Sequence, residues 1–223
     1  HKDCIRITAG RNKIEIELHF LFILLLPAIY FTGYLAEYAI LLMCMLLHEL
    51  GHCMLAAFTG REFRGIKVLP VGFIASIQET EWNGAGFFAT ILCGPMVNLI
   101  LAAFGLLLDY GGFEVIPAPK IQFFISANLY LFIFNIIPIL PLDGGKLLRY
   151  VLMKRVGLLP ANRAVRKLAF LIAVALMALG VVQFVGSGLN FSLFVMGVYM
   201  AVLQKSEKVE ACLMNLKHIL YRH

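Results

Sequence analysis

The chain has 223 residues, of which 61% are hydrophobic and only 14% are charged. An ordinary soluble domain is about 25% charged, so this chain has too few charges to cover a globular surface. The composition therefore argues against a soluble protein and indicates one embedded in a membrane. The net charge of +6 does not indicate a nucleic-acid partner, because no basic stripe with interleaved aromatic residues occurs.

Segments in which apolar and polar side chains alternate, and longer continuous apolar segments, follow one another along the chain. Residues 5–17 alternate between apolar and polar side chains and predict a short strand pair at the cytosolic face. Six apolar stretches come close to the roughly 20 residues that a helix needs to cross a bilayer. They cover residues 18–34, 37–58, 86–108, 121–141, 166–185 and 189–203. The predicted fold is an all-α polytopic membrane protein with about six transmembrane helices and a short membrane-associated β-hairpin or small sheet.

The hairpin is predicted over residues 63–79, which alternate around Pro70 and Gly72. Two interpretations stay open: an edge that pairs with an extended peptide, or an ordinary hairpin packed on the helices. Residues 204–223 have apolar side chains at helical spacing and predict a tail helix, lying on the membrane surface or packed on the protein. We expect one membrane-embedded domain over 1–223, with a six-span core over 18–203.

The basic residues indicate the orientation of this core. All of them except Lys120 lie in four regions, residues 1–17, 60–83, 143–167 and 204–223. Six spans with both termini on one side bring these four regions to the same face. The positive-inside rule then places that face, and both termini, in the cytosol.

Polar residues interrupt the second apolar stretch in the sequence HELGH, residues 48–52. His48 and His52 are four residues apart and therefore share one face of a helix. Two imidazoles so placed can bind one Zn²⁺, and Glu49 beside them can serve as the base that deprotonates a water. A lone histidine in a helix is usually a satisfied polar side chain. Ionisable groups inside an apolar stretch are costly and usually functional, so we interpret this cluster as a metal site.

A hydrolytic zinc site usually has three protein ligands, and depth in the membrane selects Asp143 as the third. Glu37 and Asp109 lie at the outer ends of their spans, whereas Asp143 lies at the cytosolic end of the fourth span, on the side of the two histidines. Two prolines and two glycines surround Asp143 in NIIPILPLDGG, residues 135–145, and predict a broken helix there. The alternative is a plain helix terminus with a surface aspartate.

The combination of HELGH with NIIPILPLDGG resembles the site-2 protease family of intramembrane zinc metalloproteases. CGPMVNLI, residues 93–100, is similar to the family's Gly-Pro-x-x-Asn element through Gly94, Pro95 and Asn98. The chain looks most like the bacterial sporulation branch, which cleaves an inactive pro-sigma factor. One departure is the hairpin, where residues 70–73 read Pro-Val-Gly-Phe and that branch often has Phe-Gly-Gly.

The resemblance implies roles for individual residues. His48, His52 and Asp143 would bind zinc, and Glu49 would be the general base. Asn135 would hold the substrate backbone or steady the transition state, with capping of the broken helix as its alternative role. Gly72 and Phe73 of the hairpin would contact the substrate, whereas Asn98 and Pro95 would shape helix packing near the site.

The expected function is hydrolysis of a peptide bond within or near a transmembrane segment of a membrane-bound regulatory factor, such as a pro-sigma or anti-sigma factor. The expected setting is a bacterial cell membrane, with single-span or membrane-associated substrates, inhibitory membrane proteins and lipid as partners, and no nucleic acid. A metal transporter would need further ligands along a path through the membrane, and the spans offer almost none. A catalytically inactive metal-binding scaffold would have lost the glutamate or a ligand, and all four groups are present.

Overall fold

The computed structural model describes residues 4–9, 14–60, 63–69, 72–77, 85–112, 117–187 and 193–202. The chain forms two compact units, His1–Phe134 and Asn135–His223. The tip of the predicted hairpin at Pro70 and the predicted tail helix 204–223 lie outside the described residues.

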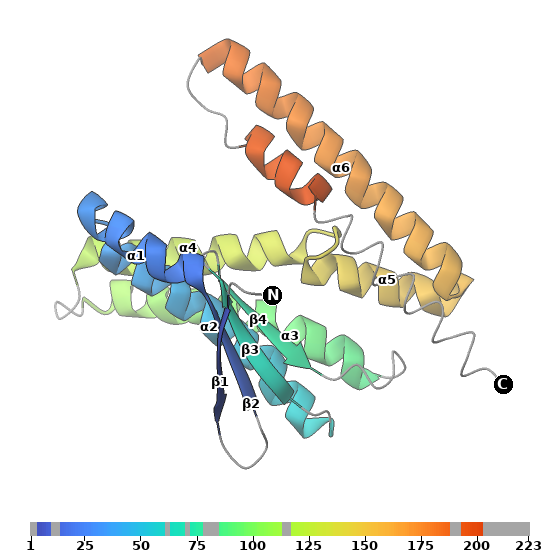
Figure 1. The fold of residues 1–223 in the computed structure, drawn as a ribbon, viewed down its shortest axis with the longest axis horizontal. Helices are drawn as coiled ribbons and strands as arrows, with labels where there is room; N and C mark the ends of the chain where they lie inside the picture. Colours follow the sequence, from blue (N-terminus) through green and yellow to red (C-terminus); the bar gives the residue numbers. More distant parts are fainter. Residues whose placement is uncertain are drawn as a thin grey trace. The chain divides into compact units, whose positions relative to one another are not determined.

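The first unit contains one four-stranded sheet in the order β1-β2-β3-β4 (Figure 1). Its strands are β1 (Cys4–Ala9), β2 (Ile14–His19), β3 (Phe63–Leu69) and β4 (Gly72–Ile77). β1 pairs with β2, and β3 with β4, in antiparallel fashion. β2 and β3 pair in parallel, with Ile16 opposite Ile66. A parallel pair needs a long crossover, and the two helices between β2 and β3 provide it. The strand pair predicted over 5–17 and the hairpin predicted over 63–79 therefore form a single sheet, with β4 at one edge.

Four helices complete this unit: α1 (Phe20–Thr32), α2 (Leu35–Phe58), α3 (Ala85–Tyr110) and α4 (Ala118–Ile136), whose last two residues belong to the second unit. The helix predicted to begin at Leu18 begins instead at Phe20, because Leu18 and His19 belong to β2. α2 and α3 pack closely at Gly51, where an added Cβ would lie 2.8 Å from Val97 Cγ2 and 3.3 Å from the Cys93 carbonyl oxygen.

The second unit contains α5 (Asp143–Val156), α6 (Leu158–Ser187) and the helix Leu193–Val202. α5 ends at Val156 and is followed by Gly157, which has a φ of 85° and lets the chain turn directly into α6. The helix Leu193–Val202 runs beside α6 (Figure 1). The contact is close because Gly180 faces Phe194 and Gly197 faces Met177, with no room for a side chain on either glycine.

Three helices among the described residues are long and apolar enough to cross a membrane: α2, α3 from Gly86, and α6 up to Gly186. α1 has 13 residues and is about 20 Å long, which is shorter than the roughly 30 Å hydrocarbon core. The helix Leu193–Val202 is shorter still. α4 ends at Ile136, before the end of the predicted span 121–141, because Pro138 disfavours helical backbone at the residue before it. The other three of the six spans remain predictions.

Candidate metal centre

The two histidines of HELGH lie side by side on α2 with their Nε2 atoms 3.2 Å apart. Their rings are nearly perpendicular, with an interplanar angle of 87°. Both side chains are buried, at 5% and 7% exposure. The spacing of four residues therefore brings two imidazole nitrogens together on one face of a helix, as the sequence predicts.

The other ring nitrogen of each histidine has an oxygen partner on α3. His48 Nδ1 lies 2.5 Å from Asn98 Oδ1, and His52 Nδ1 lies 2.8 Å from the backbone oxygen of Thr90. A carbonyl oxygen only accepts hydrogen bonds, so each Nδ1 carries the hydrogen and each Nε2 presents a lone pair. Metal-binding histidines almost always show this arrangement, in which the second nitrogen donates to a fixed acceptor.

The distance between the Nε2 atoms fits a shared metal ion. Two lone pairs that face each other in a buried place repel unless a proton or a metal ion lies between them. Zn–N bonds of about 2.05 Å at a tetrahedral angle separate two nitrogen ligands by about 3.3 Å. The observed 3.2 Å is therefore close to the separation of two nitrogen ligands on one zinc ion.

Gly94 explains how α3 passes so close to these rings. A Cβ built on Gly94 would overlap the His52 imidazole and would lie 2.9 Å from His48 Nε2. Only a glycine leaves room for both histidines at this position. The Gly-Pro-x-x-Asn element therefore does more than shape helix packing: Gly94 makes space for the rings, and Asn98 contacts one of them.

Glu49 follows His48 on α2 and is half-buried. The edge strand β4 reaches α2 one helical turn earlier, at Met45. A Cβ on Gly72, which has a φ of 143°, would lie 3.0 Å from Met45 Sδ. Gly72 itself is buried and Phe73 is half-buried. These two hairpin residues, predicted to contact substrate, begin the strand that packs on α2, the helix of the two histidines.

Asp143 belongs to the second unit, where it is the first residue of α5 and is 4% exposed. Its Oδ1 accepts a hydrogen bond from Lys146 Nζ at 3.0 Å. The chain is not helical between Ile136 and Asp143, as the prolines predict. The first turn of α5 packs directly on this irregular backbone, because a Cβ on Gly144 or Gly145 would overlap main-chain atoms of residues 136–140. Asp143 is therefore buried, and it is not the surface aspartate that the alternative interpretation requires.

Asn135, the predicted substrate-holding residue, is half-buried in the last turn of α4. It directly precedes the irregular backbone that leads to Asp143 and belongs, with that aspartate, to the second unit. Its role stays a prediction.

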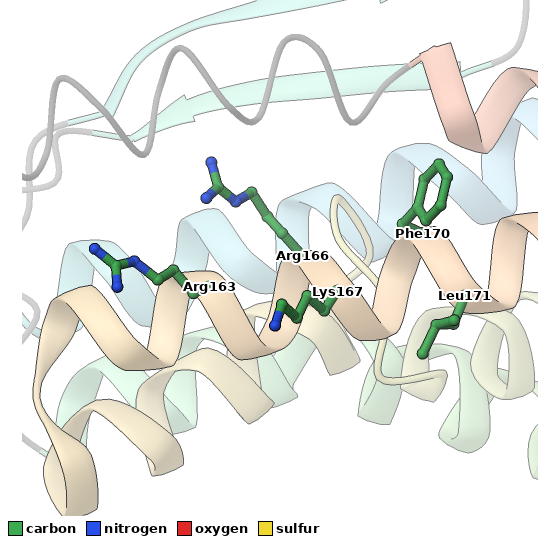
Figure 2. Close-up of a pocket in the computed structure, with 5 residues that line it drawn as sticks. All are labelled: Arg163, Arg166, Lys167, Phe170 and Leu171. Atoms are coloured by element: carbon green, nitrogen blue, oxygen red, sulfur yellow. The ribbon is translucent and has the colours of Figure 1, made fainter.

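A separate concave surface lies on the first half of α6, where Figure 2 shows the side chains of Arg163, Arg166, Lys167, Phe170 and Leu171. It contains none of the predicted metal ligands and no acidic or nucleophilic group. The side chains change from cationic to apolar within one turn, between Lys167 and Phe170. We interpret this change as the point where α6 enters the apolar part of a membrane.

Sequence reasoning missed three features around the histidines. Thr90 contributes only a backbone oxygen, which no side-chain pattern can indicate. Asn98 belongs to the Gly-Pro-x-x-Asn element, but its contact with His48 joins residues 50 positions apart. Asn128, which hydrogen-bonds to Asn98, belongs to none of the motifs. A signal that was available is the presence of uncharged amides within apolar stretches, since a buried amide needs partners.

Comparison with known proteins points to one family. The profile of peptidase family M50 matches residues 115–180. The chain is 29% identical over 205 residues to a zinc metalloprotease of Methanocaldococcus jannaschii, covering 88% of this chain and 59% of that protein. It is 29% identical over 195 residues to Stage IV sporulation protein FB of Bacillus subtilis, covering 86% of this chain and 65% of that protein. The chain thus spans about three fifths of the length of these relatives.

A solved structure agrees with these matches. The site-2 protease from Methanocaldococcus jannaschii superposes with a TM-score of 0.71 at 26% identity, covering 92% of this chain and 94% of that one. The chain is therefore a relative of the site-2 proteases, and the resemblance predicted from its motifs is confirmed. The expected likeness to the sporulation branch is confirmed by the Bacillus subtilis protein, although the archaeal relative is equally identical.

Proposed function

We propose that this protein is an intramembrane zinc metalloendopeptidase, which hydrolyses a peptide bond within or near a transmembrane segment of a membrane-bound substrate. The observation that carries the proposal is the pair of Nε2 atoms, 3.2 Å apart, on rings that are fixed by acceptors at both Nδ1 atoms. In this proposal His48 and His52 bind the metal, and Asp143 is the third ligand. The zinc metalloproteases among the relatives support the identity of the metal.

The proposed chemistry needs a metal, a base and access for water. A zinc ion held by His48, His52 and Asp143 would lower the pKa of a bound water to about 7 and would polarise the scissile carbonyl group. Glu49 takes the proton of the attacking water and delivers it to the leaving amine. Its half-buried position, next to two buried histidines, suits a base that exchanges protons with water. Asn135 is proposed to hold the substrate backbone or to steady the developing charge.

The substrate must present an extended segment, because a helix shields its own peptide bonds. We propose that this segment pairs with the edge of β4, beginning at Gly72 and Phe73. Strand addition satisfies the main-chain hydrogen bonds that unwinding frees. The support is the place of β4 at an edge of the sheet and its contact with Met45, one turn before Glu49.

The substrate class and the cellular setting are also proposals. A regulatory factor such as a pro-sigma or anti-sigma factor fits the likeness to a sporulation protein. The expected location is a bacterial cell membrane with both termini in the cytosol. The basic residues Arg163, Arg166 and Lys167 on the first half of α6 support this orientation, because the positive-inside rule assigns such residues to the cytosolic side.

Zinc content of the detergent-purified full chain tests the metal site. We expect about one zinc per chain in the wild type and a large loss in both His48→Ala and Asp143→Ala. Glu37→Ala serves as the control, because Glu37 is an acidic residue of α2 whose carboxylate lies 3.8 Å from Lys120 Nζ. A folded wild-type protein without zinc would contradict the proposal and favour an inactive scaffold. Zinc retained in Asp143→Ala would remove that residue from the ligand set.

A further inference from the structure

A series of buried amides leads away from His48 and is not explained by metal binding alone. Asn98 on α3 and Asn128 on α4 are both fully buried, at 0% exposure, and so is Cys44 on α2. Asn98 Nδ2 donates to Asn128 Oδ1 at 2.9 Å and lies 3.5 Å from the Cys44 backbone oxygen. α2, α3 and α4 of the first unit therefore meet at two amide side chains, on the Nδ1 side of the His48 ring.

The direction of every hydrogen bond in this series is determined at its far end. Asn128 Nδ2 donates to the backbone oxygen of Phe124 at 2.9 Å and to Cys44 Sγ at 3.2 Å. A backbone oxygen only accepts, so the Asn128 amide can have only one orientation, with Oδ1 facing Asn98. This in turn requires Asn98 to present its Nδ2 to Asn128 and its Oδ1 to His48.

The orientation of Asn98 decides which nitrogen of His48 carries the hydrogen. With Oδ1 towards the ring, Nδ1 is protonated and the lone pair of Nε2 is available to a metal. If Asn98 turned over, its NH₂ group would face Nδ1, and the hydrogen of the neutral ring would move to Nε2. That tautomer cannot bind a metal through Nε2. Within a buried network, a turned amide would place two donors or two acceptors against each other, which is costly.

We propose that Asn128 is a positioning residue that fixes the Nε2-metal-binding tautomer of His48 through Asn98. The proposal rests on the proposed zinc site. Asn128 lies one hydrogen bond further from His48 than Asn98 does. It is expected to control metal affinity through Asn98. Replacing Asn128 by leucine keeps the branched shape of the side chain, with some added volume, but removes both the donor and the acceptor that hold Asn98 in place.

The test uses three variants of the full chain in detergent: Asn128→Leu, Asn162→Leu and the double variant Asn128→Leu/Asn98→Asp. Zinc affinity is measured by competition with a chelator. Asn128→Leu should weaken zinc binding about 10- to 100-fold, the usual effect of losing an outer partner of a metal-binding histidine. Asn162 is another buried helical asparagine, at 2% exposure, so Asn162→Leu controls for the loss of a buried amide and should bind zinc as the wild type does.

The double variant separates positioning from a general structural effect. A carboxylate accepts hydrogen bonds through both oxygens, so the side chain introduced by Asn98→Asp would accept from Nδ1 whichever way it is turned. Asn98→Asp should therefore restore most of the zinc affinity in the Asn128→Leu background. If Asn128→Leu weakens binding but Asn98→Asp restores none of it, the tautomer explanation is wrong.

A second measurement needs no zinc. The ¹⁵N NMR signals of the histidine rings, recorded on the metal-free protein and assigned by comparison with His48→Ala, report which nitrogen is protonated. We expect Nδ1–H at His48 in the wild type and a shift towards Nε2–H in Asn128→Leu. An unchanged tautomer in that variant would overturn the inference. Failure of the wild type to bind zinc would instead contradict the proposed function, so the two failures are distinguishable.

Discussion

Gly94 on α3 lies so close to His52 on α2 that a single added carbon would overlap the imidazole ring. The same carbon would lie 2.9 Å from Nε2 of His48. The position of the two imidazole rings therefore depends on the absence of a side chain at Gly94. A methyl group at this position would displace either the two rings or the α3 backbone. Movement of the rings is expected, because a helix backbone is harder to displace than a side chain.

Gly94→Ala should therefore abolish stoichiometric zinc binding while the helices remain formed. Overpacking of a buried contact typically costs about 1–3 kcal/mol of folding free energy, so a fall in thermal stability is expected as well. Zinc content and far-ultraviolet circular dichroism provide the measurement. Gly186→Ala is the matched control, because nothing lies within 4 Å of its added Cβ. Full zinc content in Gly94→Ala would show that the rings can adjust without cost.

Zinc affinity should depend on the side chain that contacts His48 but not on the side chain of the residue that contacts His52. His52 Nδ1 donates to a backbone oxygen, that of Thr90, whereas the Thr90 hydroxyl donates to the Gly86 backbone oxygen at 2.7 Å. Thr90→Val leaves the backbone oxygen in place and should retain zinc affinity within about twofold. Asn98→Leu removes the acceptor of His48 and should weaken zinc binding about 10- to 100-fold. Equal losses in both variants would mean that packing, rather than the hydrogen bond to Nδ1, supports the rings.

The sequence predicts those parts of the site that a single turn of helix determines. HELGH places two imidazoles on one face because its spacing matches the helical repeat, and the Nε2 distance of 3.2 Å agrees. The irregular backbone before Asp143 was predicted for a similarly local reason, since prolines prevent a continuous helix. Both predictions depend only on neighbours in the sequence.

Contacts between distant segments could not be predicted in this way. The contact of Asn98 with His48 depends on how α3 is rotated against α2, which the apolar faces of two mostly hydrophobic helices leave undetermined. The parallel pairing of β2 with β3 joins residues 50 positions apart, such as Glu15 and Gly65. The first helix was placed over Leu18 and His19 because apolar composition alone does not distinguish the end of a strand from the beginning of a helix.

Glu49→Gln separates catalysis from metal binding. The amide cannot accept a proton from the attacking water, so cleavage of a membrane-bound substrate should fall by at least about 10²- to 10⁴-fold. Zinc content should stay near one per chain, because Glu49 is not among the proposed ligands. Glu37→Gln is the control on the same helix; it weakens only a partly exposed ion pair with Lys120, worth about 0–1 kcal/mol, and should cleave normally. Cleavage retained in Glu49→Gln would remove this residue from the mechanism.

Lys146 competes with a metal for Asp143 if that carboxylate is a ligand. Its ammonium group donates to Asp143 Oδ1 at 3.0 Å, and its positive charge opposes a second cation at the same carboxylate. The lysine side chain is 42% exposed, so solvent screens the interaction and its contribution stays at or below about 1 kcal/mol. Lys146→Met should therefore tighten zinc binding modestly, by up to about fivefold.

The measurement is chelator competition, with Lys154→Met as the control. Lys154 lies on the same helix, and its Nζ is 4.7 Å from the centre of the Tyr150 ring, so its removal changes the charge of α5 equally without touching Asp143. Tighter binding in Lys146→Met alone would support direct competition at Oδ1, because a general electrostatic effect would appear in both variants. Weaker binding in Lys146→Met would contradict competition and show that the lysine holds the Asp143 carboxylate in its ligating position.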